Sequence, residues 1–88
     1  MITPEEKEKI LEIADKYQVK VLYIFGSAVE NDTYNDIDIA VKGIKPEYFF
    51  KFYGELLSSL SKHVDIVDLS RKTRFNKIIE RDAVKIYG

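Results

Sequence analysis

Two aspartates one residue apart lie in an apolar stretch of this 88-residue chain. Asp36 and Asp38 precede a β-rich run, Ile39-Ala40-Val41, that predicts a strand. Because a strand places residues i and i+2 on the same face, the two carboxylates should project together. Their mutual repulsion is unfavourable unless a cation lies between them, and carboxylate oxygens are ligands that Mg²⁺ prefers. The spacing therefore indicates a metal site.

A Gly-Ser pair ends the preceding apolar run, residues 19–25, and could supply phosphate contacts. Gly26 permits a sharp turn with close approach of the backbone, and backbone N–H groups together with the Ser27 hydroxyl could contact phosphates. Taken alone, the pair could be an ordinary turn. Its place between a predicted buried strand and two spaced carboxylates favours a metal–nucleotide site. No Gly-Lys-Ser/Thr follows, so this is not a Walker A loop.

A third aspartate, Asp65, lies in another apolar run, residues 64–69, and could join the pair. If this strand and strand 36–42 both flank strand 19–25, or lie close by, the three carboxylates can converge. Such a triad suits two Mg²⁺ ions about 3.5–4 Å apart and the transfer of a phosphoryl or nucleotidyl group. Asp65 could also accept the proton of an attacking hydroxyl.

The alternative is that these aspartates are ordinary strand-end residues, solvated or capping turns. It applies most to Asp36, which ends an Asn-rich loop, and least to Asp38 and Asp65, which have apolar neighbours on both sides. Asp68 has the opposite parity to Asp65 and lies at a strand end, so we expect only a turn role for it.

The elements that position these residues follow from apolar periodicity and from capping signals. Residues 83–87 are expected to form an apolar tail that packs back on the domain. One helical turn is expected after Ser27. The alternation predicts an α/β (α+β) fold in which a small mixed sheet is packed with helices. The expected helices cover residues 4–17, 46–62 and 73–82, and the expected strands cover residues 19–25, 36–42 and 64–69.

The composition excludes several classes of protein. Residues 1–88 suffice for one small domain, and an apolar fraction of 45% is normal for a packed core. The chain has no cysteine, which excludes disulfides and thiolate metal sites and fits a cytoplasmic protein. No segment approaches the roughly 18 apolar residues of a membrane span, and there is no signal-peptide core. A net charge of −1 argues against direct nucleic-acid binding.

Three segments together resemble the minimal nucleotidyltransferase family, within the DNA polymerase β-like nucleotidyltransferase superfamily. They are Ile24-Phe25-Gly26-Ser27, Asn35-Asp36-Ile37-Asp38-Ile39 and Val64-Asp65-Ile66-Val67, and the resemblance covers nearly the whole chain. It implies that Gly26 and Ser27 hold a nucleoside triphosphate. It also implies that Asp36 and Asp38 bind both Mg²⁺ ions and that Asp65 completes the shell of the catalytic ion and helps to activate the acceptor hydroxyl.

The resemblance further implies a partner. Family members are often the antitoxins of HEPN-domain toxins, and some transfer AMP from ATP to a toxin tyrosine. Many relatives carry arginine after Gly-Ser and a second basic residue two positions on, whereas this chain has Ala28 and Glu30. Those two residues favour the alternative of a binding module that neutralises a HEPN partner by contact, with weak or no catalysis. A small-molecule nucleotidyltransferase ranks lower, because the chain has no room for an acceptor domain. The oligomeric state stays open.

Several other residues allow two interpretations. A basic cluster near the C-terminus could contact phosphate or a partner, but a solvated helix face is favoured. His63, the single histidine, is expected to be structural or exposed. Tyr34 could touch a base or be exposed, and part of the aromatic set in residues 46–62 is expected to be exposed for a partner. The basic cluster comprises Arg71, Lys72, Arg74, Lys77 and Arg81.

Overall fold

Helices and strands alternate along residues 1–88, all of which the computed structural model describes. The order agrees with the predicted alternation, and the strand at residues 36–42 has the predicted bounds. The elements are α1 (Pro4–Lys16), β1 (Val21–Phe25), α2 (Ser27–Glu30), β2 (Asp36–Lys42), α3 (Pro46–Ser59), β3 (His63–Asp68), α4 (Arg74–Asp82) and β4 (Val84–Tyr87).

The four strands form one mixed sheet in the order β3-β2-β1-β4. β2 pairs antiparallel with β1 and parallel with β3, which places β2 and β3 side by side. Only one of the two aspartate-bearing strands, β2, is a neighbour of β1, and β3 lies close by on the far side of β2. A parallel pair needs a crossover, and α3 supplies it.

The apolar tail packs back on the domain, as expected, but it does so as a strand that was not predicted: residues 84–87 form the edge strand β4, antiparallel to β1. Without β4, the outer edge of β1 would leave backbone N–H and C=O groups without partners. The sheet therefore has four strands rather than three.

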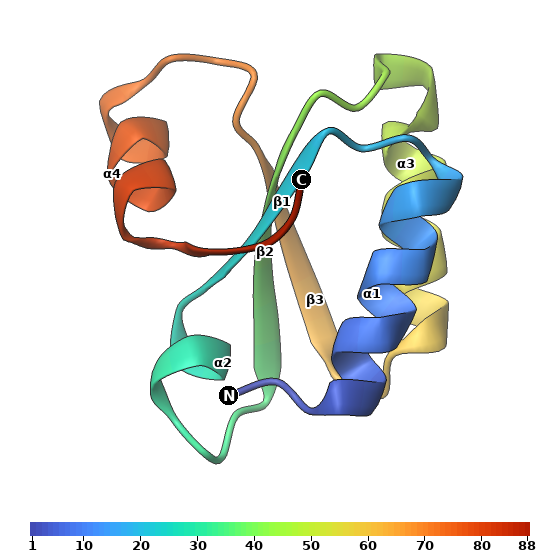
Figure 1. Ribbon diagram of the computed structural model, residues 1–88, viewed down its shortest axis with the longest axis vertical. Coiled ribbons are helices and arrows are strands. Elements are labelled where there is room, and N and C mark those ends of the chain that lie inside the picture. Colours follow the sequence, from blue (N-terminus) through green and yellow to red (C-terminus); the bar gives the residue numbers. More distant parts are fainter.

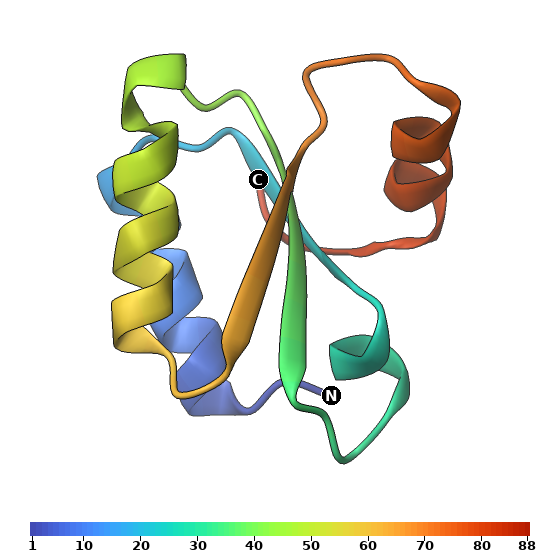
Figure 2. The same ribbon diagram turned by 180° about the vertical axis from the view of Figure 1, so that it is seen from behind.

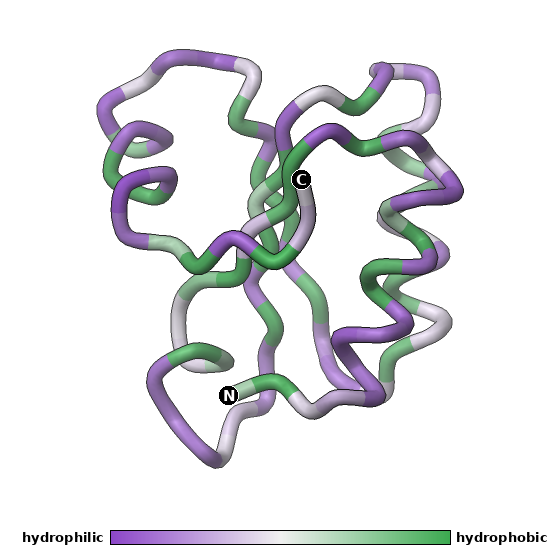
Figure 3. The backbone as a smooth tube through the Cα atoms, viewed as in Figure 1, coloured by the Kyte–Doolittle hydropathy of each residue, from purple (hydrophilic) through white to green (hydrophobic).

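The helices lie on both sides of the sheet (Figure 1), and the reverse view shows the same layers (Figure 2). α1 and α3 pack side by side on one face, where the largest cluster of buried apolar side chains lies. On the other side, α4 lies near one end of the sheet and α2 near the opposite end. Figure 3 shows hydrophobic residues along the central strands and a largely hydrophilic loop before α4. No helix has both the length and the apolar character that a membrane crossing requires.

Local signals fix the helix starts. Thr3 and Glu6 form a reciprocal capping box at α1, and Pro4 lies in its first turn. Thr73 caps α4 by accepting a hydrogen bond from the Asn76 N–H.

Candidate functional site

The strand register brings two of the predicted site residues directly opposite each other. Asp38 of β2 pairs with Asp65 of β3 in the parallel ladder and with Phe25 of β1 in the antiparallel one. Asp36 lies two residues earlier on β2, so it projects from the same face as Asp38. The three carboxylates therefore gather where β2 and β3 begin and β1 ends.

The pKa of Asp38 is affected by the charges of both other carboxylates. Burial raises the pKa of Asp38 above its ordinary value, and the negative charges of Asp65 and Asp36 raise it further, while His63 opposes them. Asp38 is half-buried, whereas the Asp65 side chain is 58% exposed. Because like charges disfavour the ionised form, a bound cation would relieve the repulsion.

Gly26 places the backbone directly against the Asp38 carboxylate. Its φ is +75°, a conformation that residues with a side chain rarely adopt. A Cβ atom added there would fall within 3.0 Å of Asp38 Oδ2, closer than real Cβ atoms come to a neighbour. Ser27 follows at once as the first residue of the one-turn helix α2, as predicted. Glycine is therefore required at position 26 both by the positive φ of the turn and by the closeness of the Asp38 carboxylate.

The donor set suits a hard divalent cation, although the side chains as placed do not form a tight group of three acidic or histidine ligands. Asp36, Asp38 and Asp65 offer only carboxylate oxygens, which Mg²⁺ prefers over nitrogen or sulfur. Burial, and after it the negative charges of Asp65 and Asp36, raises the pKa of Asp38. The absence of a side chain at Gly26 leaves the Asp38 carboxylate room on one side.

His63 is a polar neighbour of the site that sequence reasoning set aside. Its Nε2 lies 3.1 Å from Asp65 Oδ1, and its Cα lies opposite that of Asp36. The signal was available, because His63 and Asp65 have the same parity on one strand. Its exposure agrees with the prediction, but its contact with a candidate ligand was not foreseen.

The two departures from the family pattern lie in different environments. Ala28 is completely buried, whereas Glu30 is exposed. An arginine could not replace Ala28 without displacing the apolar side chains packed around it. No cation from α2 therefore accompanies Gly26 and Ser27.

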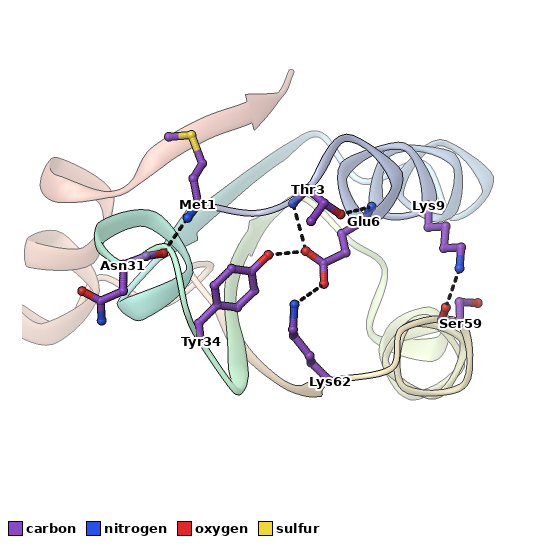
Figure 4. A network of polar contacts seen from close by, with 8 residues as sticks. All are labelled: Met1, Thr3, Glu6, Lys9, Asn31, Tyr34, Ser59 and Lys62. Carbon is purple, nitrogen blue, oxygen red and sulfur yellow. Dashed lines mark hydrogen bonds and ion pairs between the residues drawn. The ribbon is translucent and has the colours of Figure 1, made fainter.

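Tyr34 does not have either of its expected roles. It is only 7% exposed, and its hydroxyl donates a hydrogen bond to the Glu6 carboxylate of α1 (Figure 4). The ring is therefore committed to the interior rather than to a base. Asp68, by contrast, has the predicted turn role, since its carboxylate accepts a hydrogen bond from the Ser70 N–H at 2.9 Å.

Part of the basic cluster lies at the other end of the sheet. Arg71, Lys72 and Lys77 border a pocket of about 340 Å³ beside Lys42, which pairs with Glu80. Asp36 and Lys42 are the first and last residues of β2, so Lys42 lies about 20 Å from Asp36 along the strand. All five side chains of the cluster are exposed, as predicted.

Comparisons with known proteins agree with the fold. Residues 8–88 match the family described as "Polymerase beta, Nucleotidyltransferase". A crystal structure of a toxin–antitoxin with AMP-PNP is 26% identical, with a TM-score of 0.77 over 93% of this chain and 73% of that one. A chain in the structure of the tri-AMPylated Shewanella oneidensis HEPN toxin in complex with MNT antitoxin is 27% identical to this chain. Its TM-score is 0.72 over 94% of this chain and 70% of that one. The toxin–antitoxin MntA–HepT is 25% identical, with a TM-score of 0.71 over 94% and 70%. No curated protein matches.

Proposed function

Because the chain belongs to the polymerase β nucleotidyltransferase family, we propose that it transfers AMP from ATP to a hydroxyl group of a partner protein. The proposed acceptor is a tyrosine hydroxyl. The observation that carries the proposal is the direct register of Asp38 with Asp65 beside the Gly26 turn. The proposed partner is a HEPN-domain toxin, for which the chain would be the antitoxin.

The similar structures support the donor and the partner. One contains AMP-PNP, an ATP analogue, and another is a HEPN toxin that carries three AMP groups in complex with its MNT antitoxin. The present chain is 26% and 27% identical to these structures. A cytoplasmic location and a single domain over residues 1–88 stay predictions.

The proposed step is an in-line displacement at the α-phosphorus of ATP. The acceptor oxygen forms a bond to that phosphorus, the bond to the β-phosphate oxygen breaks, and pyrophosphate leaves. Asp65, which is exposed at the start of β3, accepts the proton from the acceptor hydroxyl. Gly26 and Ser27 hold the triphosphate at the end of β1.

Two Mg²⁺ ions are the proposed cofactors. Asp36 and Asp38 would hold both, and Asp65 would complete the shell of the catalytic ion. When bound, the ions would neutralise charge on the triphosphate and on the oxygens of the bond that forms and the bond that breaks.

The direct test is incubation of the protein with radiolabelled ATP, Mg²⁺ and a candidate HEPN-domain partner, followed by mass analysis of both proteins. We expect AMP to be added to a tyrosine of the partner. The variant Asp38→Asn should abolish labelling, whereas Asp68→Asn removes a carboxylate near Asp65 that belongs to a turn and should leave it intact. Equal labelling by both variants would refute the assignment of the site.

Neutralisation by contact is the second candidate, and Ala28 and Glu30 favour it because α2 supplies no cation to the triphosphate. The double variant Asp36→Asn with Asp38→Asn separates the two functions. Joint loss of AMP transfer and of neutralisation supports the enzyme. Neutralisation that survives in the double variant supports contact alone.

A further inference from the structure

Glu6 of α1 connects the two loops that lead into the aspartate-bearing strands (Figure 4). Its carboxylate accepts hydrogen bonds from the Tyr34 hydroxyl, in the loop before β2, and from Lys62 Nζ at 2.9 Å, in the loop before β3. It also accepts a hydrogen bond from the Thr3 N–H at 2.9 Å. One carboxylate thus joins three separate segments of the chain. We call Glu6, Tyr34 and Lys62 the Glu6 network.

The Glu6 network is well shielded from solvent. The side chains of Glu6 and Lys62 are 12% and 29% exposed, and Tyr34 is 7% exposed. Lys62 Nζ lies 3.9 Å from the centroid of the Tyr34 ring, within the range of a cation–π interaction. Burial alone would raise the pKa of Glu6, but the hydrogen bonds from Thr3, Tyr34 and Lys62 outweigh it and lower that pKa to about 2. The carboxylate therefore stays ionised and bonded under ordinary conditions.

The position of the network matters more than its strength. Tyr34 comes two residues before Asp36, and Lys62 comes three residues before Asp65. Nothing else in α1 contacts both of these loops through polar groups. We infer that the Glu6 network is a positioning device that fixes the first residues of β2 and β3 relative to each other and thereby sets the spacing of the carboxylates. The inference rests on the proposed function, because it assigns the network a role in metal binding.

The physical reason is repulsion between the carboxylates. Asp38 and Asp65 lie opposite each other in the parallel ladder, and Asp36 lies two residues from Asp38 on the same face of β2. Like charges opposite each other on neighbouring strands destabilise the pairing, so repulsion tends to move the starts of the two strands apart. Bonds from Tyr34 and Lys62 to a single anion on α1 oppose that movement and hold the starts of β2 and β3 in one relative position. Groups that orient ligands in this way typically change metal affinity 10- to 100-fold.

The chain contains a second network of the same chemistry, which provides a matched control. Glu55 of α3 accepts hydrogen bonds from the Tyr17 hydroxyl, at 2.8 Å, and from Lys16 Nζ. Tyr17 caps the other end of α1, about 16 Å along the helix axis from Glu6. The Glu55 network joins α1 to α3 but touches neither loop before β2 and β3. Loss of a tyrosine hydroxyl from either network removes one hydroxyl–carboxylate bond.

The experiment compares Tyr34→Phe and Glu6→Gln with Tyr17→Phe and Glu55→Gln in the full chain. Mn²⁺ is titrated into each protein without nucleotide, and free Mn²⁺ is followed by electron paramagnetic resonance. We expect Tyr34→Phe and Glu6→Gln to weaken Mn²⁺ binding about tenfold and to speed amide exchange in residues 31–36. Tyr17→Phe and Glu55→Gln should stay within about twofold of the unmodified protein. Should Glu6→Gln fail to fold, the milder Tyr34→Phe decides.

Each outcome bears on one claim. If the unmodified protein binds no Mn²⁺, the proposed function fails. If it binds Mn²⁺ and Tyr34→Phe binds equally well, the positioning role is refuted while the proposed function stands. Equal weakening by Tyr34→Phe and Tyr17→Phe also refutes it, because general destabilisation would then explain the loss.

Discussion

Substitution of Gly26 by alanine should impair the candidate site far more than the fold. The added Cβ would fall within 3.0 Å of Asp38 Oδ2, so the carboxylate must turn away from its place beside the Gly26 turn. Gly26 also has φ +75° and ψ −152°, a region that residues with a Cβ occupy only under strain. We therefore expect the loss of measurable Mn²⁺ binding and of AMP transfer.

The expected loss of stability is smaller than the stability of the fold. A residue held in such a conformation costs about 1–3 kcal/mol, and rotation of Asp38 relieves the collision at the expense of its position. A chain of this length is stabilised by roughly 4–13 kcal/mol in total. Most of the protein should therefore stay folded, so that lost metal binding reports on the site.

The measurement combines urea unfolding with Mn²⁺ titration of the same preparations. Gly54→Ala is the matched control, because Gly54 lies inside α3 and an added Cβ would meet nothing within 4 Å. It should retain Mn²⁺ binding. If Gly26→Ala keeps both the stability and the Mn²⁺ affinity of the unmodified protein, then Gly26 does not have the close contact with Asp38 from which the site is argued.

The same contacts support three further predictions. Gly54→Ala should raise the free energy of unfolding by about 0.5–1 kcal/mol, since alanine is the better helix former; a fall in the urea midpoint would contradict this. Asp38→Asn should raise the melting temperature of the metal-free protein, because it removes charge from a repulsive cluster, while AMP transfer is lost; a lower melting temperature would contradict the repulsion. Glu6 has a pKa lowered to about 2, so its stabilising contribution is complete above its unfolded value of about 4.5 and is lost as the pH falls toward 2. Between pH 5 and pH 2 the free energy of unfolding should fall by about 1–2 kcal/mol more in the unmodified protein than in Glu6→Gln, after allowance for solvent screening. An equal fall in both proteins, measured by urea unfolding, would refute that role.

Local sequence signals predicted the elements well where one residue type decides the backbone. Thr3, Pro4 and Glu6 fix the start of α1 through a capping box, and alternating apolar residues give β2 its predicted bounds. α3 ends at Ser59 rather than at residue 62, because Leu60 takes an extended conformation that leads toward β3. The last turn of a helix depends on the path of the chain beyond it, which local patterns describe poorly.

Contacts between distant segments could not be inferred from local patterns. β4 has only four residues and becomes a strand because the edge of β1 needs a partner, which periodicity within residues 83–87 does not reveal. Tyr34 lies in a polar loop, and its burial depends on Glu6, 28 residues away. The contact of His63 with Asp65 could have been inferred from strand parity, but its importance depends on the pairing of β3 with β2.

The site arises from sheet topology rather than from any single motif. Asp38 is the third residue of β2 and Asp65 is the third residue of β3, and parallel pairing aligns them at the same level. β1 runs the other way and ends at this level, so Gly26 is the first residue beyond it and turns over the Asp38 carboxylate. A one-residue slip of β3 would point Asp65 toward the apolar core and bring Val64 to the open face.

Packing in the core also fixes the register of the strand that carries Asp65. Val64 is completely buried, and its carbonyl accepts a hydrogen bond from the Tyr53 hydroxyl of α3 at 2.9 Å. Both contacts hold β3 in the register that places Asp65 opposite Asp38. In the metal-free protein this register leaves the repulsion between the carboxylates uncompensated. Substitution of Val64 by a polar residue should consequently reduce metal binding together with stability, whereas Asp38→Asn should separate the two.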